Sequence, residues 1–130
     1  MGIFISLLLT LFFSEVCLAN EANKTYEINL EKWKIDADPI NNAVGITNAL
    51  NWAAEEGYST IKFPAKEYLI DENSCVEIKD MSNVTIDLNG ATLKLNPNAL
   101  LKSKIIHMQR CVNVNLINGT IAGDINEHDY

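Results

Sequence analysis

The sequence has little positive charge. Ten lysines and arginines stand against 17 aspartates and glutamates, which gives a net charge of −7. A nucleic-acid-binding surface needs an excess of basic side chains, so this balance argues against a nucleic-acid partner. The chain also lacks the run of about 20 apolar residues that a transmembrane helix needs. With 130 residues, 48% of them hydrophobic and 21% charged, it fits one globular domain and is too apolar for a disordered chain.

The motifs of several common enzyme classes are also missing. The sequence contains no CxxC pair, no HExxH motif, no glycine-rich phosphate loop and no arrangement typical of a Ser-His-Asp triad. Its carboxylates are scattered, whereas glycoside hydrolysis requires two carboxyl groups at a fixed separation. We therefore assign no catalytic residue and no metal ligand from the sequence.

The densest group of acidic side chains lies near the end of the sequence, where Asp124, Glu127 and Asp129 surround His128. Such a group lines a sugar groove or holds a cation in some proteins, and in others it is a solvated loop. We take Asp124 and His128 as candidate substrate-binding residues, with the solvated loop as the alternative. The two tryptophans, at positions 33 and 52, are expected to pack beneath the helix, with stacking on sugars as the alternative.

Residues 1–19 have the pattern of a secretory signal peptide. The segment from Gly2 to Phe13 is uncharged and apolar, and a stretch ending in Ala19 follows it. Because this segment is too short for a transmembrane helix, we predict cleavage after Ala19 and a secreted, extracellular protein that is not attached to a membrane. No Lys or Arg precedes the apolar segment, which departs from the usual signal, and a short membrane anchor is the alternative.

One amphipathic helix is predicted after residues 20–37, which form a polar N-terminal extension. Asp38 is suited to cap the helix and Pro39 to occupy its first position. The helix is predicted from Ile40 to Glu56, with Gly57 as a left-handed residue after it. The apolar stripe of the helix is predicted to consist of Ile40, Ala43, Val44, Thr47, Leu50, Ala53 and Ala54.

After the helix, apolar residues alternate with polar ones, which predicts short strands separated by tight turns. Sixteen asparagines support this interpretation, because Asn tolerates the left-handed conformation that turns require. The strands also repeat along the chain, so that Val76 is equivalent to Ile106 and Asn83 to Asn113. A repeat of about 30 residues, built from short strands and turns, indicates the stacked coils of a solenoid, and a hairpin meander is the alternative.

The alternation also predicts which side chains face inward. We expect the helix to cover the open end of the first layer and to contact the strand that contains Ile61 and Phe63. The last layer, near Ile121, has no cap, so a longer parent protein or a homo-oligomer is expected to cover it. The predicted inward set is Ile61, Phe63, Val76, Ile78, Val84, Ile86, Leu88, Leu93, Ile106, Met108, Val114, Leu116 and Ile121.

The repeat predicts contacts between successive layers, as exposed ion pairs and as stacked turn asparagines. Cys75 and Cys111 are expected to remain unbridged, because they occupy different positions of the repeat and their Cα atoms lie too far apart. The predicted pairs are Arg110 with Asp80, His107 with Glu77, Asn83 with Asn113, and Asn89 with Asn118.

The turn and strand residues also carry a family resemblance. Residues 61–70 have the form fPaG-x-Y-x-I, with Lys66 in place of the glycine, and residues 83–93 have the form nVtIdlnGatl. With the acidic segment and the alanine-containing helix before them, they resemble the start of the pectin-lyase-like, right-handed parallel β-helix family, over about residues 33–124. The resemblance implies an all-β fold, in which residues 38–130 form one N-terminal capping helix and the first coils of a right-handed parallel β-helix. Because the coils are few, we expect the chain to be truncated.

The same resemblance implies an exported, carbohydrate-active protein that degrades or binds an acidic or surface polysaccharide, as a polysaccharide lyase or a glycoside hydrolase does. Family members carry their catalytic acids on coils past the third, so the reacting centre is expected to be missing from this chain. A non-enzymatic adhesin or structural spike domain is the alternative from a different class. No cofactor is expected in this chain, and a calcium ion is allowed for only in a full-length parent.

Overall fold

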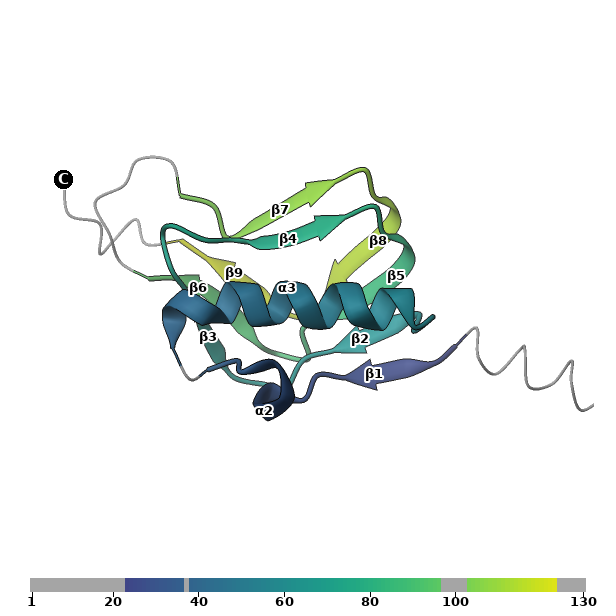
Figure 1. The fold of residues 1–130 in the computed structure, drawn as a ribbon, viewed down its shortest axis with the longest axis horizontal. Coiled ribbons are helices and arrows are strands. Elements are labelled where there is room, and N and C mark those ends of the chain that lie inside the picture. The colour runs from purple at the N-terminus through teal and green to yellow at the C-terminus, as the bar shows by residue number, and fades with distance from the viewer. Residues whose placement is uncertain (1–22, 37, 97–102, 124–130) are drawn as a thin grey trace, which may run out of the picture.

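The computed structural model describes residues 23–36, 38–96 and 103–123 of the 130-residue chain (Figure 1). The predicted signal peptide and the candidate residues Asp124 and His128 lie outside the described residues. Within the described ranges, no helix is both long and apolar enough to cross a membrane. The helices are α2 (Leu30–Trp33) and α3 (Pro39–Glu55). The strands are β1 (Thr25–Glu27), β2 (Thr60–Lys62), β3 (Glu67–Ile70), β4 (Val76–Lys79), β5 (Ser82–Asp87), β6 (Thr92–Leu95), β7 (Ile106–Gln109), β8 (Val112–Ile117) and β9 (Thr120–Ala122).

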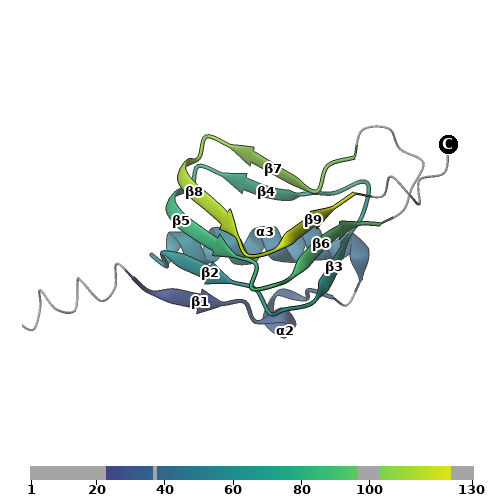
Figure 2. The same ribbon diagram turned by 180° about the vertical axis from the view of Figure 1, so that it is seen from behind.

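The strands form three small sheets in which every pairing is parallel, as Figure 1 shows from one side and Figure 2 from behind. The strand orders are β1-β2-β5-β8, β3-β6-β9 and β4-β7. Val76 pairs with Ile106 and Val84 with Val114, which confirms the predicted register between these strands. The parallel pairing excludes the hairpin meander, because hairpins join antiparallel strands.

The prediction of an all-β, right-handed parallel β-helix is wrong. Helices make up 22% and strands 39% of the described residues, so both elements build the fold, and the strands belong to three separate sheets and form no regular solenoid. The spacing between paired strands also varies, since Thr25 is further in sequence from its partner Thr60 than Thr60 is from its partner Thr85. Alternation shows which side of a strand is buried, and it predicts neither the lengths of connections nor the short helix α2.

The hydrophobic core lies between the sheets and α3, and most of the predicted inward set belongs to it. The remaining five side chains lie on β7, β8 and β9, where Met108 and Ile121 are 43% and 44% exposed. Ile106, Val114 and Leu116 are partly buried and pack against the core, as predicted. The inward prediction is wrong for Met108 and Ile121, which no further described element covers. The eight confirmed core residues, each at most 4% exposed, are Ile61, Phe63, Val76, Ile78, Val84, Ile86, Leu88 and Leu93.

The long helix α3 begins as predicted. Oδ1 of Asp38 accepts a hydrogen bond from the backbone N–H of Ile40 at 3.0 Å, and Pro39 occupies the first helical position. Gly57 follows the helix with a φ of +88°, also as predicted. The predicted apolar stripe is partly wrong, because Ile40 and Val44 are 60% and 53% exposed. The buried face of α3 consists of Asn42, Ala43, Gly45, Ile46, Ala49, Leu50 and Ala53.

Two polar side chains of α3 hydrogen-bond to strand backbones. These bonds explain why the buried face of α3 differs from the predicted apolar stripe. Asn42 is 2% exposed, and its Nδ2 donates to the carbonyl oxygen of Leu69 in β3 at 3.0 Å, while its Oδ1 accepts from the backbone N–H of Asp36. Oγ1 of Thr47 accepts from the backbone N–H of Glu77 in β4 at 3.0 Å. The main contacts of α3 are therefore with β3 and β4, and not with the strand of Ile61 as predicted.

Asparagines near the strand ends adopt the left-handed conformation, and one of the two predicted stacks forms. Asn83 and Asn113 have φ values of 58° and 55°, and Nδ2 of Asn113 donates to Oδ1 of Asn83 at 2.9 Å. The side chains of Asn89 and Asn118 do not stack as predicted, because Nδ2 of Asn118 donates to Oδ1 of Asp87 at 3.1 Å. A carboxylate is the stronger acceptor, which accounts for the different partner.

Candidate functional site

Four aromatic side chains meet on one side of the molecule, and we call them the aromatic surface. They are Tyr26 of β1, Trp33 of α2, Trp52 of α3 and Tyr58, which follows α3. The centroids of contacting rings lie between 5.0 and 6.0 Å apart, and each side chain remains partly exposed. Nε1 of Trp33 donates to the hydroxyl oxygen of Tyr26 at 2.9 Å, which holds α2 against β1. The rings therefore pack on the core and also present a surface to solvent.

Two exposed lysines lie over the aromatic surface. Nζ of Lys24 is 4.2 Å from the centroid of the Tyr58 ring. Nζ of Lys32 is 4.1 Å from the Trp52 ring and 4.9 Å from the Trp33 ring. Attraction between an ammonium group and the face of an aromatic ring favours these positions. The aromatic surface thus combines flat apolar faces with two cations at contact distance.

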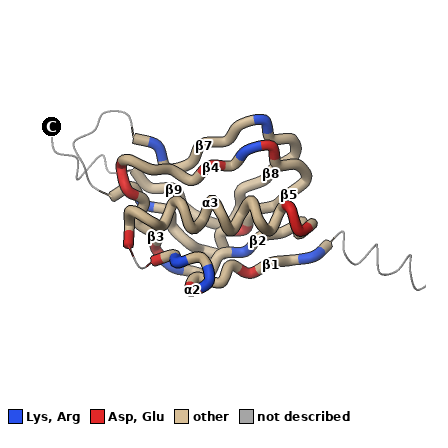
Figure 3. Tube along the Cα trace, viewed as in Figure 1, with Lys and Arg blue, Asp and Glu red and all other residues tan. Residues whose placement is uncertain are grey.

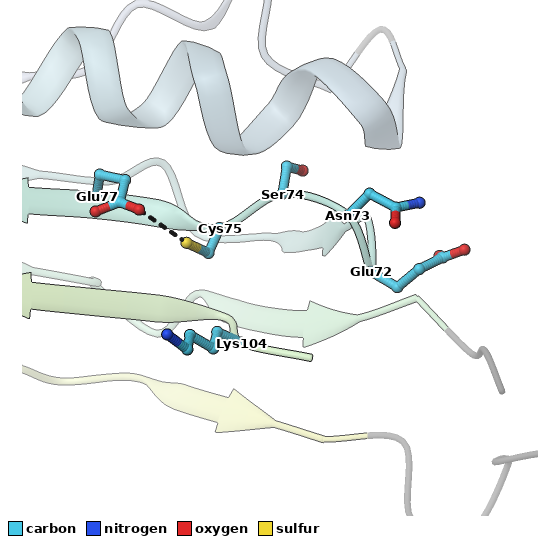
Figure 4. Close-up of a pocket in the computed structure, with 6 residues that line it drawn as sticks. All are labelled: Glu72, Asn73, Ser74, Cys75, Glu77 and Lys104. Carbon is cyan, nitrogen blue, oxygen red and sulfur yellow. Dashed lines mark hydrogen bonds between the residues drawn. The ribbon is translucent and has the colours of Figure 1, made fainter. Parts of the chain in front are cut away.

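A second candidate site is a polar pocket of about 290 Å³ at the start of β4, which we call the β4 pocket (Figure 4). Oγ of Ser74 is buried and has no hydrogen-bond partner among the described residues. Figure 4 shows the hydrogen bond between the side chains of Cys75 and Glu77 beside the pocket, with Lys104 on the neighbouring segment. The lining residues are Glu72, Asn73, Ser74, Cys75, Glu77 and Lys104.

The carboxylate of Glu77 connects a thiol and an imidazole at this pocket. Sγ of Cys75 donates to Oε1 of Glu77 at 3.3 Å, and Nδ1 of His107 lies 3.1 Å from Oε2, which confirms the predicted pair. The hydrogen bond from Cys75 lowers the pKa of Glu77, and burial followed by that hydrogen bond raises the pKa of the Cys75 thiol. The thiol therefore stays protonated and the carboxylate ionised near neutral pH. A nucleophilic thiol and a proton-donating carboxylic acid require the opposite states.

The other predicted contact between charged side chains is also confirmed. Nε and Nη2 of Arg110 donate to the two carboxylate oxygens of Asp80 at 2.6 and 3.1 Å, and this hydrogen bonding lowers the pKa of Asp80. Cys75 and Cys111 are free thiols, as predicted. Among the described residues, no group of three His, Cys, Asp or Glu side chains is arranged to hold a metal ion.

The sequence predicted some of these groupings and missed others. The sequence paired His107 with Glu77 through its repeat. It did not include Cys75, whose thiol reaches the carboxylate only because it lies two positions before Glu77 in the chain. It considered the two tryptophans but not the two lysines, which come from different parts of the chain. The adjacency of Lys32 and Trp33 was the signal available for them. The sugar-binding role of Asp124 and His128 stays a prediction.

No family model matches the chain, and no solved structure matches it. Among curated proteins, the chain is similar to the SPbeta prophage-derived uncharacterized protein YorA of Bacillus subtilis (strain 168), with 27% identity over 118 residues. The match covers 81% of this chain and 20% of YorA, so the chain spans about one fifth of the length of this relative. The relative is uncharacterized, and it lends no support to the resemblance to the pectin-lyase-like family.

Proposed function

We propose that this protein is exported and binds an acidic polysaccharide through the aromatic surface. The observation that carries the proposal is the position of Lys24 and Lys32, whose ammonium groups lie 4.2 and 4.1 Å from the centroids of partly exposed rings. A sugar ring has an apolar face of C–H groups that stacks on an aromatic ring, and the carboxylate of a uronic acid pairs with an ammonium group. The aromatic surface offers both kinds of contact at adjacent positions.

The charge of the whole chain bears on how such binding would work. A net charge of −7 repels a polyanion at long range, so the two lysines must act at contact distance. Each exposed pair of this kind contributes about 0–1 kcal/mol. Affinity is therefore expected to depend on several sugar rings that contact the aromatic surface together, and to fall as salt screens the two lysines.

The chemistry of the β4 pocket bears on whether Glu77 could act as a catalytic acid. In the β4 pocket, Cys75 donates to Glu77, His107 lies at hydrogen-bond distance from Glu77, and the pKa of Glu77 is lowered. Glycoside hydrolysis needs a carboxylic acid whose pKa is raised, so that it can protonate the leaving oxygen. Glu77 is therefore unsuited to act as the general acid of a hydrolase, and binding is the function we propose for the described residues.

Affinity electrophoresis of the full chain in gels that contain polygalacturonate, alginate or neutral dextran tests the proposal. We expect the two polyuronates to retard the protein and dextran to leave its mobility unchanged. The double variant Lys24→Ala, Lys32→Ala should bind roughly threefold to tenfold more weakly. The matched control Lys79→Ala, Lys104→Ala changes the net charge equally and leaves the aromatic surface intact, so its retardation should equal that of the wild type. Equal weakening of both double variants would contradict the proposal.

Intrinsic fluorescence gives a second measurement, because Trp33 and Trp52 are the two tryptophans of the chain. Stacking of a sugar on the aromatic surface should change their emission, and the change should saturate as polyuronate is added. Retardation by a polyuronate without any change in emission would place the binding elsewhere on the molecule and refute a role for the aromatic surface.

A further inference from the structure

The last strands of the three sheets, β7, β8 and β9, lie at the same end of the molecule, and we call their free side the open edge (Figure 2). Within the described residues, each of these strands pairs with one neighbour only. Met108 and Ile121 are 43% and 44% exposed there, whereas their register partners one layer below, Ile78 and Leu93, are each 1% exposed. The open edge therefore has the side chains of a core layer and no cover among the described elements.

The open edge carries basic side chains, although the whole chain is acidic. Residues 103–123 include Lys104, His107 and Arg110 and contain no Asp or Glu, and Figure 3 shows basic positions along this layer. In the layer below, the carboxylates of Glu77 and Asp80 contact His107 and Arg110. Carboxylates of β4 and of the turn after it therefore lie on one side of these side chains, and no described element lies on the other side.

We propose that the open edge binds an extended, acidic strand of a partner polypeptide, which adds to the sheets beside β7 and β8. Unpaired backbone groups of the edge would hydrogen-bond to the added strand, as in other cases of strand addition. Apolar side chains at alternate positions of the added strand cover Ile106 and Met108. An acceptor between them hydrogen-bonds to His107, and a carboxylate beyond them pairs with Arg110. A second copy of this chain fits less well, because joining two open edges brings like charges together.

The chain itself provides the sequence of a probe. The segment from Val76 to Leu88 pairs with β7 and β8 from below, with Glu77 and Asp80 against their basic partners. A synthetic peptide of residues 76–88 is therefore the probe, and the same peptide with Glu77→Lys, Asp80→Lys and Asp87→Lys is its control. We expect saturable binding of the acidic peptide to the full chain by fluorescence anisotropy, and binding of the lysine peptide that is at least roughly tenfold weaker.

Two variants of the protein show where the peptide binds. Met108→Asp places a carboxylate on the open edge at a partly exposed side chain, so the fold should persist while the acidic peptide binds roughly tenfold more weakly. Val44→Asp makes the same change at a side chain of α3 that is 53% exposed, and it should bind as the wild type does.

Three results would overturn the proposal. They are equal binding of both peptides, equal behaviour of the two variants, and absence of peptide binding by a folded wild type. Sedimentation velocity separates the remaining case: a dimer that forms with rising concentration, and that Met108→Asp abolishes, would show that a second copy covers the open edge instead. None of these outcomes depends on polysaccharide binding, so this proposal and the proposed function fail independently.

Discussion

Replacement of Asn42 by alanine should destabilise the protein more than the small loss of side-chain volume suggests. The side chain is 2% exposed and joins the backbone of Asp36, before α3, to the backbone of Leu69 in β3. Asn42→Ala removes both of these part-buried hydrogen bonds. Each hydrogen bond contributes about 0.5–1.5 kcal/mol net, so loss of the two should lower the free energy of unfolding by about 1–3 kcal/mol. A typical domain is stabilised by roughly 5–15 kcal/mol, so the change is measurable.

Urea unfolding followed by tryptophan fluorescence measures this change, and Asn48→Ala is the matched control. Asn48 lies on the same helix and is exposed, so both substitutions add the same helix propensity, and only one removes buried hydrogen bonds. The control should stay within about 0.5 kcal/mol of the wild type. If Asn42→Ala also stays within that range at an unchanged m value, the hydrogen bonds to Asp36 and Leu69 do not stabilise the fold, and the reasoning is refuted.

Three further changes test other parts of the structure. Burial, with a smaller effect from the charge of Asp36, raises the pKa of Tyr68 from 10.0 to about 12. The neutral phenol is therefore favoured in the folded state. Its contribution to stability is full below pH 10.0 and is lost as pH rises toward 12. Urea unfolding at several pH values should show this loss in the wild type and not in Tyr68→Phe. Because Arg110 lowers the pKa of Asp80, Arg110→Gln should raise it toward its ordinary value in an NMR titration, and an unmoved Asp80 would contradict the pair. Ile86→Asp should abolish the circular dichroism of the folded state, because a carboxylate replaces a side chain that is 1% exposed, and a native spectrum would refute the strand register.

The register between layers could be predicted from the sequence because two local signals agree. Alternation with a period of two fixes which side of a strand is buried, and left-handed turn residues fix where each strand ends. Asp80 and Asn83 have φ values of 54° and 58°, and their equivalents one repeat later, Arg110 and Asn113, have 53° and 55°. Because the same turn recurs, contacts between equivalent positions of successive layers follow from it, and the ion pair of Arg110 with Asp80 is one of them.

The fold class and the candidate sites depend on contacts that these local signals do not report. The buried face of α3 includes Asn42, which a purely apolar pattern excludes, because its burial depends on hydrogen bonds to distant backbone groups. Position 45 of this face requires glycine, because the carbonyl oxygen of Trp33 in α2 would lie 2.5 Å from a Cβ atom added to Gly45. The aromatic surface likewise joins β1, α2 and α3, so it exists only once these three elements are packed together.

The two ends of the stacked sheets differ in how their strand edges are covered, and the difference bears on what can bind at the open edge. On the side of α3, Asn42 reaches one carbonyl oxygen of β3 and Thr47 reaches one N–H of β4. Side chains of a helix satisfy an edge only at such isolated points, because the helix uses its own backbone groups internally. At the open edge, β7, β8 and β9 each lack a second strand neighbour among the described residues. Only an extended segment places its backbone donors and acceptors at the same spacing as those of a neighbouring strand. A strand therefore fits β7 and β8 better than a second helix does.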